Sequence, residues 1–260
     1  MDGIQAIVLG LIQGATEWLP ISSEAQTMLY MLNHLGLDPQ TALTYAFFLH
    51  AGTMIAAFVR FREEFFDVLR NLSPSFPMTR VLVIATLCTA VSAVPLYLLL
   101  RYASVDADGT VFTLIIGLML IVTGLVMQRA GSAGERHLAE MTDADAILVG
   151  VAQGFAIIPG ISRSGTTVAA LLARNIEQET ALTVSFLMSV PAALGVLALD
   201  SGNIAQIPLQ TAAVLLASSL AAGYLCIDVL LAVARRVAFW IFCVALGTLT
   251  VVLVVGGALL

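Results

Sequence analysis

Apolar runs of nearly constant length are the strongest constraint on what this chain can fold into. Each is close to the roughly 20 residues that a helix needs to cross a bilayer. The runs lie at 41–60, 81–100, 111–128, 181–199, 209–227 and 237–260. Charged residues make up 11% of the chain, against about 25% in a typical soluble domain. We therefore expect an all-α polytopic membrane protein, with six spanning helices in a single membrane domain over residues 1–260.

The placement of arginine predicts the orientation, because short cytoplasmic loops are enriched in Lys and Arg. The chain has no lysine, and nine of its arginines fall in loops that belong on one side of the six runs. They are Arg60, Arg62, Arg70, Arg80, Arg129, Arg136, Arg174, Arg235 and Arg236. Only Arg101 lies in a loop on the other side, so we expect a multi-pass protein of the plasma membrane with its C-terminus outside. Arg163 fits neither side, and an arginine in an apolar region is costly enough to indicate function.

Three further features narrow the functional class. Cys88, Cys226 and Cys243 all fall in the apolar runs without the spacing of metal ligands, which favours buried thiols. The net charge of −6 and the lack of a basic stripe do not suggest a nucleic-acid partner. The N-terminal segment starts with an acidic rather than a basic residue, so we expect no cleaved signal peptide.

Two hydrophobic segments are too short and too broken to span the membrane: residues 2–33, interrupted at Pro20, and residues 143–174, interrupted at Pro159 and Gly160. They resemble each other at an offset of 140, where seven of eighteen positions are identical. The identical pairs are Ala6/Ala146, Ile7/Ile147, Gly10/Gly150, Gln13/Gln153, Gly14/Gly154, Ile21/Ile161 and Ser22/Ser162. The sequence "TALT" at 41–44 also recurs at 180–183. We interpret the chain as two repeats, of approximately residues 1–128 and 141–260.

Three spans lie between the two copies, so the copies have opposite orientations in the membrane. This is the inverted-repeat plan of many transporters, in which broken helices from the two halves meet near the midplane. Irregular backbone at that depth is tolerated only where protein or a water-filled cavity satisfies its polar groups. We therefore expect two re-entrant helical hairpins whose breaks, "LPISSE" and "PGISRSGTT", face each other across a polar cavity.

The break "PGISRSGTT" has the character of an anion site. Ser162 is a good N-cap, and the helix that follows, through Ala173, begins with unpaired N–H groups and a partial positive charge. Arg163 and nearby hydroxyls add donors suited to phosphate oxygens. The hydroxyl residues are Ser162, Ser164, Thr166 and Thr167. In the alternative interpretation, Ser162 only caps the helix and Arg163 neutralises a buried acid.

The first break, within "QGATEWLPISSEAQ", supplies the acid. Glu17 lies four residues after Gln13 and therefore on the same helical face. A carboxylate at this depth needs a partner, which would be Arg163 across the repeat interface or a divalent cation. Ser23 and Gln26, three residues apart, match a capping box for the second helix.

These motifs carry a family resemblance. "QGATEWLPISS" and "PGISRSGTT" resemble the first and second motifs of the integral-membrane undecaprenyl-diphosphate phosphatases, enzymes also known for conferring bacitracin resistance. The resemblance extends over the whole chain in length, span count and motif placement. It implies removal of the terminal phosphate of a long-chain polyprenyl diphosphate, which recycles the lipid carrier of cell-envelope sugars. It also implies a required divalent cation, Mg²⁺ or Ca²⁺. The functional set that it implies is Gln13, Glu17, Ser23, Ser162, Arg163, Ser164 and Thr167.

The resemblance also suggests roles for these residues. Arg163 and the hydroxyls of the second break would hold the phosphoryl charge, and Gln13 and Gln26 would line the same phosphate site. Glu17, directly or as a ligand of the cation, would orient the attacking group. That group is either water or Ser23 as a covalent nucleophile.

The chain departs from the usual family pattern at two positions. The first family acid is often Glu where Gln13 stands, which removes one metal ligand, and the family commonly has "SSTGH" where this chain has "SSEAQ". Gln26 therefore replaces an expected histidine. The family usually has a glutamine where His50 stands in "FFLHAGT", so His50 and Gln26 would be exchanged residues, with His50 as base or nucleophile. Otherwise His50 is a hydrogen-bonded helix histidine. Glu24 is a second candidate base, or a first-turn acid favoured by the helix dipole.

The main rival function is a transporter or flippase that carries polyprenyl phosphate without hydrolysing it, because inverted repeats with paired re-entrant segments are typical of transporters. The set of acid, arginine and serine favours the enzyme. A transporter would tolerate Glu17→Gln if that group only binds. Small residues in "LASSLAAG" at 216–223 would allow close helix packing, within one subunit or between two subunits of a homodimer.

Overall fold

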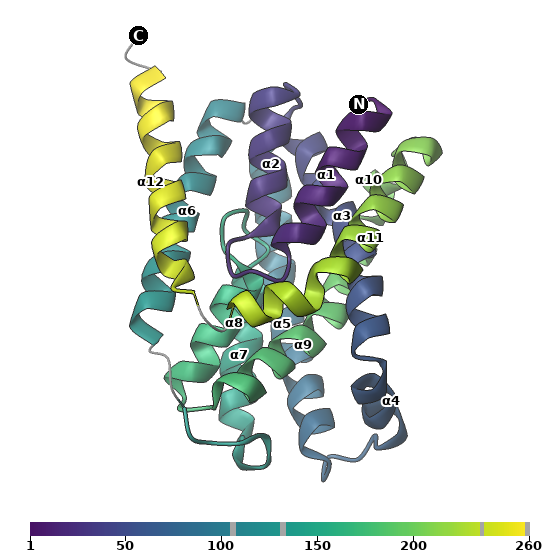
Figure 1. Cartoon of the computed structure of the whole chain (residues 1–260), viewed down its shortest axis with the longest axis vertical. Coiled ribbons are helices and arrows are strands. Elements are labelled where there is room, and N and C mark those ends of the chain that lie inside the picture. Colours follow the sequence, from purple (N-terminus) through teal and green to yellow (C-terminus); the bar gives the residue numbers. More distant parts are fainter. Residues whose placement is uncertain (105–107, 131–133, 235–236, 258–260) are drawn as a thin grey trace.

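The computed structural model describes residues 1–104, 108–130, 134–234 and 237–257. Within these ranges the chain forms twelve α-helices, one short 3-10 helix and no strand. Most of the helices run along the long axis of the molecule and gather into one bundle (Figure 1). The all-α architecture predicted from the sequence is therefore confirmed.

Six helices in the described part of the chain are long and apolar enough to cross a membrane. They are α3 (Pro39–Arg60), α5 (Pro77–Ser104), α6 (Gly109–Ala130), α9 (Gln178–Leu199), α11 (Leu209–Ala234) and α12 (Phe239–Gly257). Each covers nearly all of a predicted run, and residues 258–260 of the last run lie outside the described residues. Local rules explain the bounds: α3, for example, begins with Asp38 as a side-chain cap and Pro39 in the first turn. Cys88, Cys226 and Cys243 lie in these helices as free thiols; Cys243 is buried, as predicted, whereas Cys88 and Cys226 are partly exposed.

Four shorter helices form two hairpins. They are α1 (Gly3–Thr16), α2 (Ser23–His34), α7 (Asp143–Phe155) and α8 (Arg163–Ala173). In Figure 1 the α1–α2 hairpin occupies the upper half of the molecule and the α7–α8 hairpin the lower half, with their loops at mid-height. The predicted helix breaks at Pro20 and at Pro159 and Gly160 are confirmed. That the hairpins enter the bilayer without crossing it, and that an inverted repeat relates them, stays a prediction.

Each hairpin packs on a helix from the other part of the chain: α1 contacts α11, and α7 contacts α5. Glycines make these crossings close. A Cβ at Gly14 would lie 2.5 Å from the Gly223 nitrogen in α11, and a Cβ at Gly150 would lie 2.4 Å from the Ala85 carbonyl oxygen in α5. A larger residue would force the backbones apart. The glycines at these positions therefore allow close helix crossings in both hairpins.

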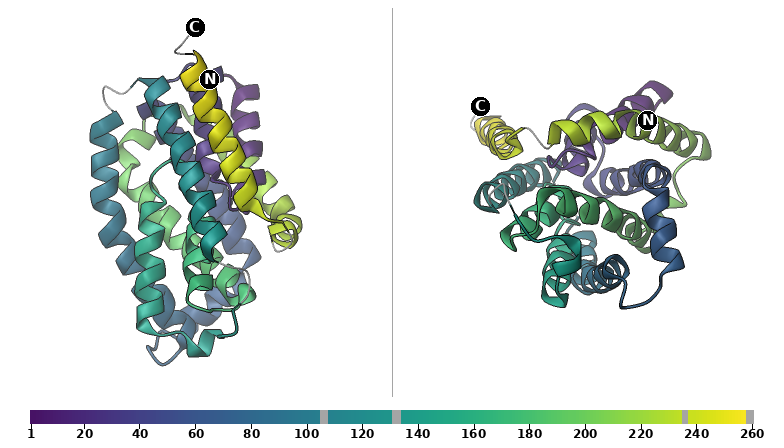
Figure 2. Two further views of the ribbon diagram at one scale, coloured as in Figure 1. Left: turned by 90° about the vertical axis from the view of Figure 1, so that its left-hand side faces the viewer. Right: turned by 60° about the horizontal axis from the view of Figure 1, so that its bottom comes forward.

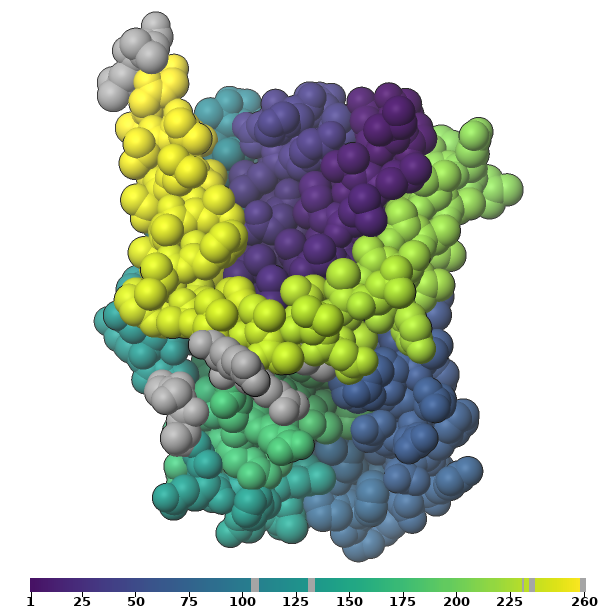
Figure 3. All heavy atoms as spheres, in the orientation of Figure 1, coloured from purple at the N-terminus to yellow at the C-terminus, as the bar shows by residue number. Residues whose placement is uncertain are grey.

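The small residues at 216–223 serve packing within the chain. Side chains added at Gly10 and Gly52 would collide with Ser218 and Ser219 of this stretch. In the space-filling view, α11 crosses the face of the molecule directly beneath α1 (Figure 3). Packing within one subunit is thus confirmed, and a homodimer stays a prediction.

Loop arginines gather at the end of the molecule opposite to the start of α1 and the end of α12. This end carries α4 (Arg62–Arg70) and the 3-10 helix η1 (Leu138–Glu140) (Figure 1). Arg101, on α5, pairs instead with the buried Asp200, which precedes the short α10 (Ser201–Ile204). The edge of the bundle is formed by α12, which packs on α6 (Figure 2). The predicted cytoplasmic residues Arg235 and Arg236 lie outside the described residues.

Asp145 fastens the base of the α7–α8 hairpin. Its buried carboxylate accepts hydrogen bonds from Arg136 at 2.7 Å, from Arg174 at 2.6 Å and from the Thr142 N–H at 2.8 Å. Burial alone would raise the pKa of Asp145, but the bonds from Arg136, Thr142 and Arg174 outweigh it and hold that pKa well below its usual range.

We expect Asp145→Asn to lower the free energy of unfolding by about 2–3 kcal/mol at neutral pH. This is less than the loss for a fully buried pair, because both arginines are partly exposed. The folded-state pKa is depressed, so the carboxylate contributes stability above its unfolded pKa of about 3.9 and loses it as the pH falls through the folded value. The stability difference between the wild type and Asp145→Asn should therefore hold from about pH 8 to about pH 5 and shrink below about pH 4.

Thermal unfolding in detergent across this pH range measures the effect. Asp143→Asn is the matched control, because Asp143 shares the first turn of α7 but is exposed. A difference that stays constant down to the lowest pH would contradict the assigned role of the Asp145 charge.

Candidate active site

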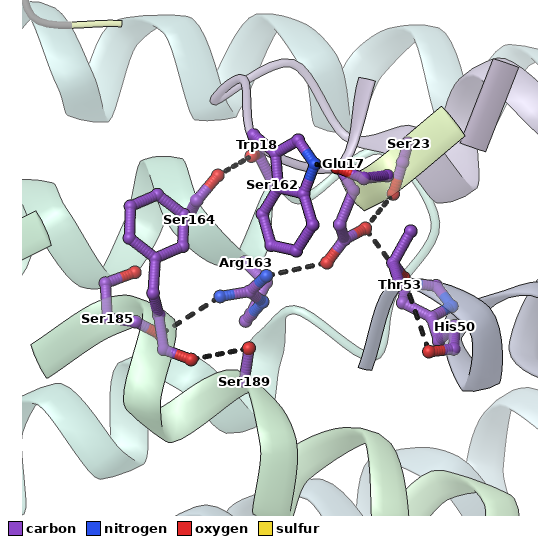
Figure 4. A network of polar contacts seen from close by, with 12 residues as sticks. Glu17, Trp18, Ser23, His50, Thr53, Ser162, Arg163, Ser164, Ser185 and Ser189 are labelled. Carbon is purple, nitrogen blue, oxygen red and sulfur yellow. Dashed lines mark hydrogen bonds and ion pairs between the residues drawn. The ribbon is translucent and has the colours of Figure 1, made fainter. Parts of the chain in front are cut away.

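The two hairpin loops meet the middle of α3 and α9, and the predicted site residues converge there (Figure 4). Glu17 follows α1, Ser23 begins α2, Arg163 begins α8 and His50 lies on α3. Glu17 and Arg163 point toward each other in Figure 4, although 146 residues separate them in the sequence. The two breaks therefore face each other, as predicted.

Glu17 is the centre of the polar network, and only 8% of its surface is exposed. Its Oε1 accepts a hydrogen bond from Arg163 Nη2 at 2.6 Å. Its Oε2 accepts hydrogen bonds from Ser23 Oγ at 2.5 Å and from Gln13 Nε2 at 3.0 Å. The other terminal nitrogen of Arg163, Nη1, donates to the Ser185 carbonyl at 3.0 Å. The predicted partnership of Glu17 and Arg163 is confirmed, and it balances the charge of the buried acid.

The capping box predicted at Ser23 and Gln26 is wrong. Ser22 caps α2 instead: it adopts a φ of 59°, and its side chain accepts a hydrogen bond from the Ala25 N–H. Ser23 is then the first residue of the helix, and its hydroxyl turns into the site. Gln26 donates its amide to the Ile21 carbonyl at 3.1 Å. Glu17 lines two cavities, a small pocket between the loops and a larger one among the spanning helices, and Gln26 is not among the described residues of either wall. The structure thus places Gln26 behind the loop rather than at a phosphate site.

His50 reaches the site from α3. Its Nδ1 lies 2.8 Å from the carbonyl oxygen of Ala46. Because a carbonyl oxygen only accepts, Nδ1 carries a proton, and Nε2 faces Glu17 Oε2 at 3.5 Å. His50 is therefore both hydrogen-bonded within its helix and directed into the site. Its exchange of roles with Gln26 stays a prediction.

The start of α8 presents hydroxyl groups to the same space. Ser162 caps the helix by accepting a hydrogen bond from the Gly165 N–H at 3.2 Å, as predicted. Its hydroxyl lies 3.4 Å from that of Ser164, which donates to the Leu19 carbonyl in the opposite loop. Ser164 therefore ties the two loops together.

Thr166 and Thr167, near the start of α8, make their hydrogen bonds within the helix and, for Thr167, to α9. Thr167 Oγ1 donates to the Arg163 carbonyl at 2.8 Å and shares a 2.7 Å hydrogen bond with Ser185 Oγ. Thr166 donates its backbone N–H to the Ser162 carbonyl. Neither threonine is among the described residues that line the cavities at Glu17. Thr167 thus links α8 to α9, and direct phosphate contacts by Thr166 or Thr167 stay a prediction.

A small pocket lies between the loops. Its volume is about 30 Å³, enough for a water molecule. Glu17, Ser23, Glu24, His50 and Arg163 are all in its wall. Glu24 Oε1 is buried and has no hydrogen-bond partner among the described residues. Because an unpaired buried polar atom is costly, this oxygen is a candidate to bind a ligand.

The donor set fits a divalent cation that arrives with a substrate better than a cation held by the protein alone. In the part of the chain that the structure describes, no three His, Cys, Asp or Glu side chains are placed to hold a metal ion. Mg²⁺ often keeps several waters and binds through one or two carboxylates plus substrate phosphates. Glu17 and the unpaired Oε1 of Glu24 would supply these carboxylates.

Sequence reasoning missed three hydroxyl residues at the site: Thr53, Ser185 and Ser189. Thr53 lies 3.4 Å from Gln13 Nε2 and follows His50 by about one helical turn. Ser189 lines a larger cavity that continues from the site and also has Glu17 and Arg163 in its wall. The repeat carried a signal for it, because the 139-residue offset of "TALT" makes Ser189 the counterpart of His50.

Comparisons with known proteins identify the family of this chain. A family model described as "Bacitracin resistance protein BacA" matches residues 6–252. The chain belongs to this family. The match of the BacA family includes both hairpin loops and all of α3 and α9, so it covers every residue of the polar network.

Several members of the BacA family are similar over nearly their whole length. A protein of Methanothrix thermoacetophila named undecaprenyl-diphosphatase is 47% identical over 255 residues, which cover 97% of both chains. Proteins of the same name from Haloarcula marismortui and Methanopyrus kandleri are 44% and 41% identical. The aligned region covers 95% of both chains for the Haloarcula protein. For the Methanopyrus protein it covers 93% of this chain and 92% of the relative. The family resemblance inferred from the two motifs is thus confirmed.

Proposed function

We propose that this protein hydrolyses a long-chain polyprenyl diphosphate, of the undecaprenyl type, to the monophosphate and inorganic phosphate. It would thereby recycle the lipid carrier of cell-envelope glycan synthesis, in the plasma membrane and with its C-terminus outside. Membership in the BacA family and the names of the relatives support this function. Nothing in the comparisons supports the alternative of a transporter or flippase.

The observation that carries the proposal is the 2.5 Å contact between Ser23 Oγ and Glu17 Oε2, beside Arg163. A hydroxyl held on a buried carboxylate can pass its proton to that carboxylate as it attacks. Ser23 Oγ would attack the terminal phosphorus, which forms a phosphoserine and releases polyprenyl monophosphate. Water would then attack the phosphoserine and release inorganic phosphate. Direct attack of water on the diphosphate is the alternative route.

Arg163 would hold the phosphoryl charge, because phosphoryl transfer is catalysed mainly by positioning and electrostatic stabilisation. In the structure its guanidinium bridges Glu17 and the Ser185 carbonyl. A bound diphosphate would compete with Glu17 for this guanidinium. When Arg163 turns to the phosphate, Glu17 keeps its hydrogen bond to Ser23 through Oε2 and can take the Ser23 proton there.

His50 would act in the second half of the reaction. Its Nε2 is directed at Glu17 Oε2 and lines the pocket that holds Ser23. Histidine is the commonest general base, and from this position it could take the proton of the water that attacks the phosphoserine. His50 would then serve where the usual family histidine is replaced by Gln26.

Glu17 and Glu24 would hold a divalent cation, Mg²⁺ or Ca²⁺, when the diphosphate binds. Such a cation neutralises phosphate charge and polarises the phosphoryl group. Glu24 is favoured as the second ligand because its Oε1 has no other partner in the described site.

Release of inorganic phosphate from undecaprenyl diphosphate by the purified protein in detergent tests the proposal. We expect release that stops with EDTA and returns when Mg²⁺ or Ca²⁺ is added. Glu24→Gln should raise the cation concentration needed for half-maximal rate, whereas Glu63→Gln, an exposed acid on α4, should not. A folded protein that binds the lipid but releases no phosphate would contradict the function. Phosphate release that continues at the same rate in EDTA would contradict only the requirement for a divalent cation.

A further inference from the structure

A larger cavity continues from the polar site in among the spanning helices. Its volume is about 370 Å³. Glu17 and Arg163 lie at its polar end, and most of the remaining wall comes from α5, α7 and α9. That wall consists largely of small apolar side chains, among them Ala93, Val94 and Val196.

This cavity opens on a surface that faces lipid. Ala90 of α5 and Gly195 and Ala198 of α9 belong to its wall, and all three are exposed. Both helices are membrane spans, and Ala90 lies in the middle of α5, where an exposed residue meets the acyl chains of the bilayer. Gly195 and Ala198 lie in the last turns of α9 and form the mouth of the cavity nearer that end of the span. An apolar chain inside the cavity could therefore continue into the membrane without passing a polar barrier.

A second large cavity, of about 440 Å³, lies on the other side of the site, near α6, α8 and the start of α12. It touches the polar network through Ser164, and Glu17, His50 and Arg163 are not in its described wall. Of the two cavities, only the one between α5, α7 and α9 joins an apolar wall to the acid and the arginine.

We propose that the first isoprene units of the lipid substrate occupy the cavity between α5, α7 and α9, with the diphosphate at its Glu17–Arg163 end. The inference rests on the proposed function and adds to it the position of the lipid tail. An apolar cavity of this size suits an apolar ligand, whereas a polar ligand would leave its donors and acceptors unpaired. A long polyprenyl tail exceeds this volume, so its distal part would lie in the bilayer.

Gly195→Leu tests this position with little risk to the fold, because a Cβ added at Gly195 meets nothing within 4 Å. The new side chain would narrow the mouth of the cavity. The measurement is kcat and KM for phosphate release from diphosphates whose tails increase from one isoprene unit to undecaprenyl. We expect Gly195→Leu to lower kcat/KM for the longest tail by roughly tenfold or more, mainly through KM. The shortest substrate should be unaffected.

Two further variants serve as controls for Gly195→Leu. Gly202→Leu is the matched control, since Gly202 also has nothing within 4 Å of an added Cβ and lies outside both cavities. Val168→Phe narrows the cavity beside α8 instead. The inference would be overturned if Gly195→Leu lowered kcat/KM equally at all tail lengths or did not lower it at all. It would also be overturned if Val168→Phe lowered kcat/KM more for longer tails.

Photo-crosslinking gives a readout that does not depend on hydrolysis. The probe is a polyprenyl monophosphate with a diazirine on its first isoprene unit. We expect it to label peptides of α5 and α9, and labelling confined to α6, α8 or α12 would overturn the inference. If the wild type labels α5 and α9 but releases no phosphate, the hydrolytic function fails and the tail position stands.

Discussion

Arg163→Ala is expected to lower kcat for phosphate release by roughly three to five orders of magnitude, the range measured for arginines that stabilise a transferring phosphoryl group. The guanidinium is the strongest donor at the site, and it lies next to the proposed nucleophile and base. Its removal also leaves Glu17 without its buried partner, so the free energy of unfolding should fall as well.

Three variants separate catalysis from folding. Arg163→Lys keeps the charge but loses the planar fork, so its rate should lie between the wild type and Arg163→Ala. The double variant Glu17→Gln with Arg163→Ala removes both charges and should regain stability without regaining activity. Arg101→Ala breaks another buried arginine–acid pair, with Asp200, and should lower stability with a much smaller effect on kcat. Near-normal phosphate release by a folded Arg163→Ala protein would rule out the proposed role of the arginine.

Ser23→Ala is expected to lower kcat by roughly a thousandfold or more, because the protein would lose its nucleophile and keep only the phosphate-binding groups. The pair of Ser23 and Glu17 acts as a unit, so Glu17→Gln should cost about as much and the double variant little more. Phosphate release measures the rate. Mass spectrometry of acid-quenched protein measures the phosphoserine, which should accumulate in His50→Ala and be absent in Ser23→Ala.

Thr27→Val is the matched control for Ser23→Ala. Thr27 lies one turn further along α2, is buried, and donates its hydroxyl to the Ser23 and Glu24 carbonyls. It is not among the described residues that line the site cavities. If Ser23→Ala released phosphate at a rate close to that of Thr27→Val, then water would be the attacking group and Ser23 would only orient it.

Local rules were sufficient to predict the spans, the two breaks and the meeting of Glu17 with Arg163. A helix of about 20 apolar residues needs no partner to be recognised. A buried acid and a buried arginine each need an opposite charge, and the repeat made each the nearest candidate partner of the other. These inferences depend on composition and on charge balance, which the sequence states directly.

The choice between Ser22 and Ser23 was not predictable in the same way. Both are serines, and either satisfies the preference for a hydroxyl at an N-cap. The structure assigns the cap to Ser22, in a left-handed conformation, and this directs Ser23 to Glu17. The hydroxyls of Ser185 and Ser189 were missed for a related reason: a single serine on an apolar helix has no local pattern, and its role depends on what the tertiary fold places beside it.

Each hairpin packs on a helix from the other part of the chain, and this has a consequence for biosynthesis. The first helix leaves the ribosome early, but Gly223, against which Gly14 packs, follows it by roughly 200 residues. At a translation rate of about 5–20 residues per second, the delay is about 10–40 s. During that time α1 can pack on α2 and α3 but lacks α11, and for most of it Glu17 has no arginine. The segment made first is therefore among the last to reach its final place, and an N-terminal half synthesised alone would lack the helix that holds its own catalytic loop.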